Sequence, residues 1–325
     1  MKIFSGIQPT GQKHLGNYSG GFRQYVATQE RGDAYFCIVD LHSISVEHDP
    51  EELGRSTLDL AAMLFACGLD PERSTVFVQS HVTAHAEANW LLSAVTSFGE
   101  LRRMTQFKEK SGKQEFVSAS LFTYPVLQAG DILLYQTDVV PVGEDQRQHI
   151  ELARDISERF NSRYGETFTL PGIETPPVGG RIMDLQEPEN KMSTTGGTPL
   201  GTVLIGDAPD TIRKKFKTAV TDSGSEIRRG PDKPGVTNLI EILSVASGET
   251  PEAIEAGHDG TGYGAFKEEV AEAVIALLEP VRLRYEALRA DPAELERLLA
   301  LGAEKARTAS APTLETMYRG LGFVR

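Results

Sequence analysis

The sequence predicts an α/β fold: a doubly wound parallel sheet followed by a helical C-terminal region. Two observations lead to this prediction. In the first half of the chain, short apolar runs alternate with segments of helical period, which is typical of parallel strands joined by crossover helices. From residue 207 onward, apolar residues recur with the helical period alone. The 325 residues, 40% of them hydrophobic, are enough to bury a large core and to divide into two domains.

Four short apolar runs are the candidate strands, at residues 3–7, 34–39, 75–79 and 139–142. Apolar side chains at helical spacing predict a helix over residues 146–160 after the last of them. A Gly/Pro-rich stretch, residues 171–180, separates this helix from one more strand-like run at residues 181–185. Residues 190–201 are small and polar, so we expect a mobile loop there.

The second half is expected to be helical, with helices at residues 210–217, 238–247, 265–288 and 294–306. Proline and glycine residues mark the connections between them, and there is no internal repeat. We therefore expect two domains, residues 1–206 and residues 207–325, with the last helix packing back on the first domain.

The formal net charge of −13 argues against a protein that coats nucleic acid with its whole surface, because binding of phosphates needs Lys and Arg side chains. A local nucleic-acid-binding site remains compatible with this total charge. Basic residues cluster at residues 102–110, 213–217 and 228–229. Each cluster taken alone is equally well explained as a solvated helix face.

Cys37 and Cys67 lie in apolar runs without the Cys and His spacing of a zinc site, so we interpret both as buried hydrophobic residues. No apolar run approaches the roughly 20 residues of a membrane span, and the N-terminus lacks the apolar region of a signal peptide. We therefore expect no metal site, no membrane contact and a cytoplasmic location.

The turn after the first candidate strand, residues 6–17, is a candidate phosphate site, because such turns commonly meet phosphates in doubly wound sheets. It lacks the usual GxGxxG pattern. Close glycines let its backbone approach a ligand, and Thr10, Lys13, His14 and Asn17 offer hydrogen-bond donors to phosphate oxygens. A plain loop with a helix cap explains the same residues equally well.

Two segments far apart in the chain resemble the signatures of the class I aminoacyl-tRNA synthetases. His14-Leu-Gly-Asn17 resembles their HIGH motif, and Lys191-Met-Ser-Thr-Thr195 resembles their KMSKS loop. A dehydrogenase that binds dinucleotides has no reason to carry the second motif. Further strings are similar to the bacterial tryptophanyl enzymes over essentially the whole chain, at residues 3–9, 104–110, 123–125, 131–135, 140–146, 149–152, 219–223 and 233–239.

This resemblance implies a Rossmann-type catalytic domain at residues 1–206, with a dimer-forming insertion around residues 101–135, and a helical anticodon-binding domain at residues 207–325. It implies a homodimer that uses ATP as a substrate, with Mg²⁺, to activate L-tryptophan to tryptophanyl-adenylate and release pyrophosphate. Transfer to tRNA(Trp) follows. No covalent nucleophile is needed from the protein, so positioning and electrostatics carry the catalysis.

The resemblance also implies the roles of individual residues. The expected tryptophan pocket consists of Phe4, Gly6, His42, Tyr124, Gln128, Asp131, Val140, Val142 and Gln146. The expected ATP site consists of Gln8, Pro9, Thr10, Gly16, Asn17, Gly143, Glu144, Asp145, Ile182, Lys191, Met192, Ser193, Thr194 and Thr195. The expected catalytic residues are His14, Asn17, Lys108, Lys110, Lys191 and Ser193, with the lysines reaching the leaving pyrophosphate.

Asp131 also stands out on physical grounds. Tryptophan is a large apolar body with one N–H donor, so its pocket needs hydrophobic walls and one buried acceptor. Asp131 lies in an otherwise apolar helical run, where a buried carboxylate is costly unless it is hydrogen-bonded. A surface aspartate at the start of a helix would fit the same position. His42 and His149 fit core histidines well, and we assign them no proton transfer.

Two positions depart from the family pattern. Thr194 stands where the family usually has a second lysine, and Gln128 stands where bacterial relatives commonly have methionine. Because of these departures, a catalytically silent paralogue that binds tRNA or senses tryptophan is an alternative function for this chain. Two further enzymes stay compatible with parts of the sequence: a tyrosyl enzyme, which shares the fold and both signatures, and a small-molecule adenylyltransferase with an HxGH-type turn.

Overall fold

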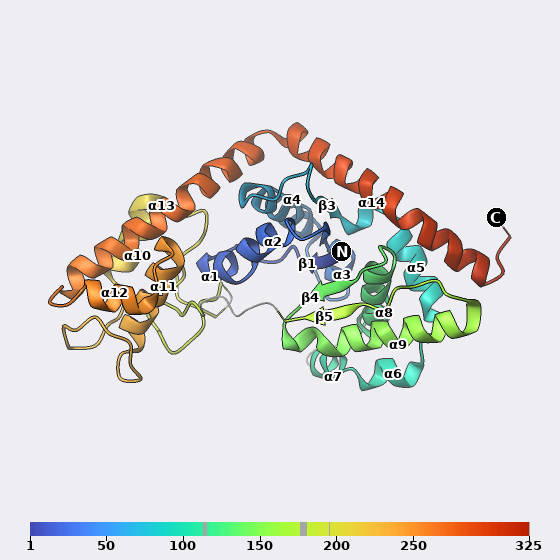
Figure 1. The fold of residues 1–325 in the computed structure, drawn as a ribbon, viewed down its shortest axis with the longest axis horizontal. Helices are drawn as coiled ribbons and strands as arrows, with labels where there is room; N and C mark the ends of the chain where they lie inside the picture. The colour runs from blue at the N-terminus through green and yellow to red at the C-terminus, as the bar shows by residue number, and fades with distance from the viewer. Residues whose placement is uncertain (113–115, 176–180, 195, 325) are drawn as a thin grey trace.

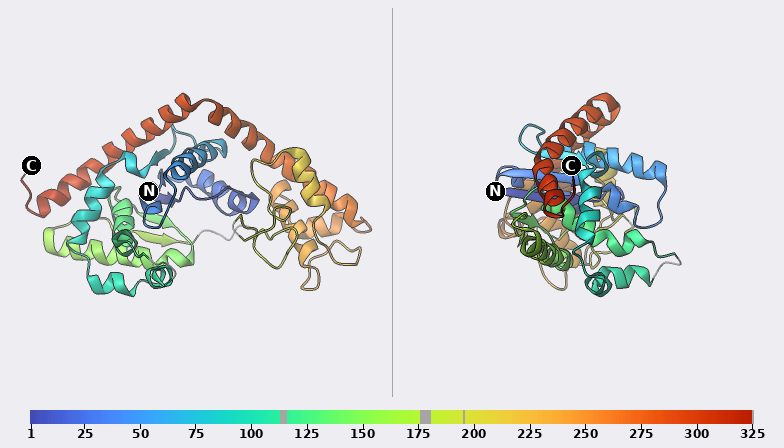
Figure 2. Two further views of the ribbon diagram at one scale, coloured as in Figure 1. Left: turned by 180° about the vertical axis from the view of Figure 1, so that it is seen from behind. Right: turned by 90° about the vertical axis from the view of Figure 1, so that its right-hand side faces the viewer.

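The computed structural model describes residues 1–112, 116–175, 181–194 and 196–324. Figure 1 shows a body built around a sheet, a second body of helices, and two long C-terminal helices that run across both. The view from behind and the side view in Figure 2 show the same division, with the two long helices forming one edge of the molecule.

The sheet is parallel and five-stranded, which confirms the predicted fold class. Its strands are β1 (Lys2–Ile7), β2 (Asp33–Ile38), β3 (Thr75–Val78), β4 (Val139–Pro141) and β5 (Gly172–Glu174), in the order β3-β2-β1-β4-β5. The register pairs Phe4 of β1 with Tyr35 of β2, and Ile3 of β1 with Val139 of β4. The strand order reverses at β1, which is where ligands bind in doubly wound folds.

The four predicted strands are present within one or two residues of their expected ends, and two differences appear beyond them. The Gly/Pro-rich stretch contributes β5, a short edge strand of half-buried residues that carries no apolar run in the sequence. The prediction of a strand at residues 181–185 is wrong, because only Met183 forms an isolated bridge there, to Lys191.

Helices cover both faces of the sheet and connect its strands. They are α1 (Leu15–Asn17), η1 (Tyr18–Phe22), α2 (Arg23–Thr28), α3 (Asp40–Ser43), α4 (Pro50–Ala66), η2 (Gln79–His81), α5 (Ala84–Ser93), α6 (Phe98–Arg103), α7 (Thr105–Ser111), α8 (Ala119–Leu133), η3 (Glu144–Gln146) and α9 (Arg147–Tyr164). The start of α4 is specified locally. Asp49 accepts hydrogen bonds from the first-turn amides of Glu51 and Glu52, and Pro50 occupies the first turn, where its missing N–H costs nothing.

The remaining helices are α10 (Pro209–Lys217), α11 (Pro234–Ser247), α12 (Pro251–Gly257), α13 (Tyr263–Ala290) and α14 (Pro292–Gly320). Four of them begin with proline. Proline favours the first turn of a helix, because its φ angle suits the helix and its missing N–H would have no partner there. The last helix extends to Gly320, well beyond residue 306, where we expected it to end. None of the helices in the described part of the chain is long and apolar enough to cross a membrane.

Helix α14 leaves the helical body and packs on the sheet-bearing body, against β3, α5 and α4 (Figure 1). It approaches the body closely at Gly302, where a Cβ atom would lie 1.8 Å from the carbonyl oxygen of Val76. Glycine is therefore required at this crossing. Tyr318 donates a hydrogen bond to Glu87 of α5 at 2.7 Å and ties the far end of α14 to the same body.

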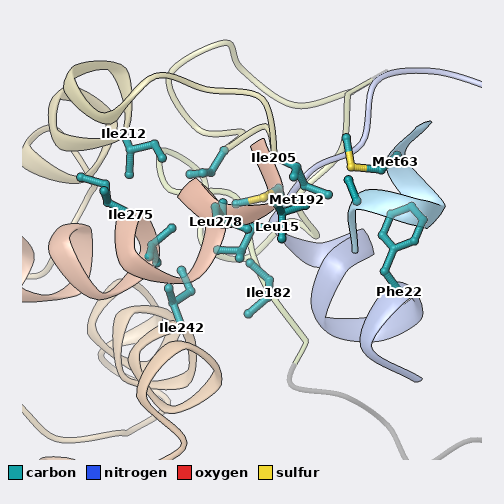
Figure 3. Close-up of a cluster of buried hydrophobic side chains, with 14 of the residues drawn as sticks. Leu15, Phe22, Met63, Ile182, Met192, Ile205, Ile212, Ile242, Ile275 and Leu278 are labelled. Atoms are coloured by element: carbon teal, nitrogen blue, oxygen red, sulfur yellow. The ribbon is translucent and has the colours of Figure 1, made fainter. Parts of the chain in front are cut away.

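One hydrophobic cluster links the two bodies. It brings together Leu15 after β1, Ile182 and Met192 of the loop region, and Ile242 and Leu278 of the helical body (Figure 3). These side chains come from segments that are distant in sequence. The turn after β1, the loop and the helical body therefore pack against one another in this cluster.

Candidate active site

A cavity of about 940 Å³ opens beside the carboxyl ends of β1 and β4, where the strand order reverses. The structure brings all nine residues of the expected tryptophan pocket to its wall: Phe4, Gly6, His42, Tyr124, Gln128, Asp131, Val140, Val142 and Gln146. It also brings Gln8, Glu144 and Asp145 of the expected ATP site to the same wall. Our expectations did not include Val39, Ser45, Gln106 and Gln148, which also line it.

Helix α8 supplies three of these residues from one face. Tyr124, Gln128 and Asp131 are spaced by four and three residues, so their side chains point the same way. The Tyr124 hydroxyl lies 2.9 Å from Nε2 of His149 and 3.3 Å from the Gln106 side-chain oxygen. Burial raises the pKa of Tyr124 to about 12, so its hydroxyl stays protonated at neutral pH.

Asp131 is 1% exposed, which excludes a surface helix cap. Nε2 of His42 lies 2.8 Å from its Oδ2, while Oδ1 receives the Gln79 amide at 2.7 Å and faces Nδ1 of His85 at 2.6 Å. Burial alone would raise the pKa of Asp131, but the hydrogen bonds from His42 and His85 outweigh it and hold the pKa well below its usual range. The carboxylate is therefore ionised in the free protein.

Part of the cavity wall is polar. The Gln128 amide donates to the Gln146 side-chain oxygen at 3.4 Å, and the Gln146 amide donates to Asp145 at 2.7 Å. Beyond them, Arg147 holds the exposed Glu144 with two hydrogen bonds of 2.6 and 2.9 Å. The cavity thus passes from a mostly apolar end near Phe4 to a charged rim.

His14 caps the short helix α1. Its Nδ1 accepts a hydrogen bond from the Gly16 amide at 3.1 Å, and its own amide donates to the Asn17 side chain at 3.0 Å. Burial, together with the positive charges of Lys191 and Lys13, lowers the pKa of His14 to about 4. The ring is therefore neutral at pH 7, and because Nδ1 is an acceptor, its proton is on Nε2.

The loop that carries Lys191 lies against this turn. Ile182 and Met192 are both 1% exposed and pack in the cluster that contains Leu15. A Cβ atom on Gly11, at φ 60°, would lie 3.4 Å from the Thr194 hydroxyl, so Thr194 also reaches the turn. The two sequence signatures, about 180 residues apart, therefore form one site. Thr195 lies outside the described residues.

Asp184, which our sequence analysis missed, organises this loop. It is buried, and its carboxylate accepts hydrogen bonds from the amides of Gln186, Glu187 and Thr198 at 2.8, 3.1 and 3.3 Å. A Cβ atom on Gly201 would overlap the same carboxylate. A lone aspartate in an irregular segment gives no signal of this role in the sequence.

The lysines expected near pyrophosphate differ in position. Lys191 is exposed in its loop, close enough to His14 to lower its pKa. Lys108 is exposed on α7 and is not among the residues that line the cavity, although Thr105, Gln106 and Glu109 of the same helix are. The side chain of Lys110 lies outside the described part of the structure.

Acidic side chains pair with several residues of the basic clusters at residues 213–217 and 228–229. Lys215 is buried and pairs with Asp207 at 2.6 Å, so it is a structural residue. Arg213 pairs with Glu272 at 2.6 Å. Only Lys214 and Lys217 of this cluster are exposed lysines. In the third cluster, Arg229 is held by acidic residues of α11 and α12.

No three His, Cys, Asp or Glu side chains of the described residues are grouped so as to hold a metal ion. The carboxylates at the cavity rim are instead separated or paired with arginine.

The family model for class I tRNA synthetases of the W and Y type matches residues 1–279. The chain is 49% identical to a tryptophan–tRNA ligase of Clostridium perfringens, covering 99% of this chain and 97% of the relative. It is 50% identical to a tryptophan–tRNA ligase of Listeria monocytogenes, at 99% and 98% coverage. The tryptophanyl-tRNA synthetase of Campylobacter jejuni, crystallised with ADP and tryptophan, superposes with a TM-score of 0.87 at 34% identity, covering 99% of this chain and all of that one.

Proposed function

The chain belongs to the class I tRNA synthetases for tryptophan and tyrosine, and on that premise we propose how its residues perform the reaction. Its activity is that of a tryptophan–tRNA ligase: ATP-dependent activation of L-tryptophan to tryptophanyl-adenylate with release of pyrophosphate, then transfer to tRNA. The comparisons thereby argue against a tyrosyl enzyme and a small-molecule adenylyltransferase, and the exchange assay described below tests the catalytically silent paralogue.

The observation that carries the site assignment is the buried, ionised Asp131 at the wall of the cavity. We assign its carboxylate to the indole N–H of tryptophan. Phe4 and Val140 supply the apolar walls that the ring needs. Gln146 and Tyr124, at the polar side of the cavity, are suited to the amino group of the amino acid.

The ATP site is assigned to the joined signatures and the cavity rim. His14 offers a neutral Nε2–H, and the backbone around Thr10 and Gly16 can approach phosphate oxygens closely. Lys191 offers a cation from the loop, and we assign Lys108 and Lys110, by the family resemblance, to the leaving pyrophosphate. Mg²⁺, brought by ATP, would neutralise charge on the phosphate oxygens.

The chemical step then needs no nucleophile from the protein. A carboxylate oxygen of tryptophan attacks the α-phosphorus in line, the bond to the bridging oxygen breaks, and pyrophosphate leaves with its electron pair. Preorganised donors that meet the developing charge lower the barrier. In the second step the terminal 2′-hydroxyl of the tRNA attacks the carbonyl carbon of the adenylate, and AMP leaves.

We assign residues 1–206 to the catalytic domain and residues 207–325 to a domain that reads the anticodon of tRNA(Trp), except that α14 returns to the sheet-bearing body. The partner in a homodimer would cover a group of exposed aromatic side chains, Trp90, Phe98 and Phe116, which are 78%, 69% and 80% exposed. We place the protein in the cytoplasm, where tRNA charging supplies translation.

The test is ATP–pyrophosphate exchange with each of the twenty amino acids, followed by tRNA charging. Exchange with tryptophan should far exceed exchange with tyrosine or phenylalanine. Asp131→Ala should lower kcat/KM for tryptophan by a factor that corresponds to roughly 2 to 4 kcal/mol, the contribution of a buried charge-assisted hydrogen bond. Wild-type kcat and KM in this variant would contradict the assignment of Asp131.

A further inference from the structure

We propose that His85, supported by Tyr135 and aided by Gln79, positions the Asp131 carboxylate so that a single acceptor site on Oδ2 is left for the indole N–H. This inference rests on the proposed role of Asp131. His85 is fully buried and does not line the cavity, so it acts through Asp131 and is a positioning residue.

Counting acceptor sites leads to this assignment. An ionised carboxylate has about four lone-pair sites, two on each oxygen. Oδ1 uses two, for the Gln79 amide at 2.7 Å and for His85 Nδ1 at 2.6 Å. Oδ2 uses one, for His42 Nε2 at 2.8 Å. With the donors of the described residues counted, one site remains on Oδ2, and both Asp131 and His42 line the cavity.

The orientation of His85 is fixed by Tyr135. The Tyr135 hydroxyl lies 2.8 Å from Nε2 of His85, and burial raises the pKa of this phenol well above its usual value. A protonated phenol donates to Nε2 of a neutral ring, which leaves the ring proton on Nδ1, facing Asp131. A doubly protonated ring would also donate from Nδ1. In both states His85 is therefore a donor to Oδ1.

The packing of α5 against α8 holds His85 in place. A Cβ atom on Gly130 would lie 3.2 Å from the Cβ of Ala88, so the missing side chain lets the two helices approach closely. His85 lies one turn before Ala88, and Asp131 directly follows Gly130. The rings of Phe77 and Tyr135 lie 5.7 Å from the His85 ring and restrict its rotation.

Loss of the His85 imidazole would leave Oδ1 one donor short in a buried place. The carboxylate would then rotate or take up a proton, and a protonated oxygen is a donor instead of an acceptor for an N–H group. The predicted defect is loss of selectivity for the indole N–H, with the apolar contacts to the ring intact.

The experiment compares L-tryptophan with β-(benzo[b]thiophen-3-yl)-L-alanine, in which sulfur replaces the indole N–H. Exchange kinetics would give the ratio of kcat/KM for the two substrates. His85→Leu should lower this ratio roughly 10- to 100-fold, mainly through KM for tryptophan, because a hydrogen bond to a charged group is lost. His85→Asn should restore most of it, since an asparagine amide can occupy the place of Nδ1.

The control is Ser157→Ala, which removes a buried hydrogen bond of 2.7 Å to the Arg154 carbonyl on α9, and neither of these residues lines the cavity. It should lower thermal stability without changing the ratio. If His85→Leu fails to fold, Tyr135→Phe and His85→Asn test the inference instead. Tyr135→Phe should lower the ratio of kcat/KM several-fold, and His85→Asn should keep a ratio near the wild-type value.

The outcomes separate the two assignments. An unchanged ratio in folded His85→Leu, or in Tyr135→Phe where the first variant does not fold, overturns the inference. If Asp131→Asn also keeps the wild-type ratio, the proposed indole acceptor itself is wrong. If Asp131→Asn lowers the ratio of kcat/KM while His85→Leu leaves it at the wild-type value, Asp131 is the acceptor and only the role of His85 is rejected.

Discussion

Single residues at this site are tuned by burial and by their neighbours. Asp131 stays ionised in a buried place because imidazole groups donate to it, whereas His14 stays neutral because burial and nearby lysines disfavour its cation. The ionised Asp131 carboxylate is a suitable acceptor for the indole N–H. The neutral His14 ring can donate a hydrogen bond but carries no charge, so lysines are needed to neutralise the phosphate charge. The contribution of Lys191 can be measured by substitution, and the charge state of His14 can be measured by titration.

Lys191→Ala should slow adenylate formation by about two to three orders of magnitude, because one cation in a water-poor site contributes roughly 2 to 4 kcal/mol to the transition state. KM for tryptophan should change little. Rapid-quench measurement of adenylate formation checks this. Thr194→Lys is the comparison and should raise the rate modestly at most. A fully active Lys191→Ala would remove the loop from the chemistry.

The His14 ring should titrate near pH 4 in the ligand-free protein, and Lys191→Ala should raise that pKa. The folded pKa lies below the unfolded value of 6.5, so the neutral ring stabilises the fold fully above pH 6.5. This contribution should decrease as the pH falls from 6.5 through about 4. NMR of the histidine ring protons, assigned with His14→Gln, measures it. A midpoint near 6.5 would contradict the prediction.

At the scale of elements, α10 combines a structural face with an exposed basic face. Ile212, Lys215 and Phe216 are buried, and Lys215 also donates to the Thr202 carbonyl at 2.7 Å. Lys214 and Lys217 are left on the surface. Any contact of this helix with tRNA phosphates therefore depends on these two exposed lysines more than on the whole basic run.

Lys214→Glu combined with Lys217→Glu should weaken tRNA charging and reduce its salt dependence, because up to two phosphate contacts are lost. ATP–pyrophosphate exchange should remain at the wild-type level. A matched control is Arg319→Glu, a charge reversal on the exposed end of α14. Unchanged tRNA charging at physiological salt in the double variant would remove α10 from the tRNA surface.

At the scale of the whole molecule, the two bodies are joined by the buried cluster around Leu15 and Leu278, while a separate aromatic surface stays exposed. The Phe98 ring lies 5.0 Å from the ring of the partly buried Phe122, and the Phe107 ring lies 5.1 Å from the same ring. Exposed aromatic side chains such as Phe98 and Trp90 are costly in water unless a partner covers them.

Trp90→Asp combined with Phe98→Asp should therefore shift the protein from dimer to monomer, as measured by sedimentation velocity. Both side chains are exposed in the single chain, so the fold of the monomer should persist, as judged by circular dichroism. Leu283→Asp, at an exposed leucine of α13, is the control and should leave the dimer intact. A dimer that survives the double substitution would place the interface elsewhere.

The sequence by itself determined the features that depend on neighbouring residues along the chain. Apolar runs marked β1 to β4, the apolar run around Asp131 singled out that carboxylate, and the two signatures pointed to the turn after β1 and the loop of Lys191. Each of these depends on a local period or string.

Only the tertiary structure decided which distant groups meet. It paired Lys215 with Asp207 and thereby removed that lysine from the surface, and it placed the Asp184 carboxylate under the loop. It also set His85, from another helix, against Asp131. The physical reason is that charge state, burial and hydrogen-bond partners are properties of a packed environment, and packing is specified by residues that are far apart in the sequence.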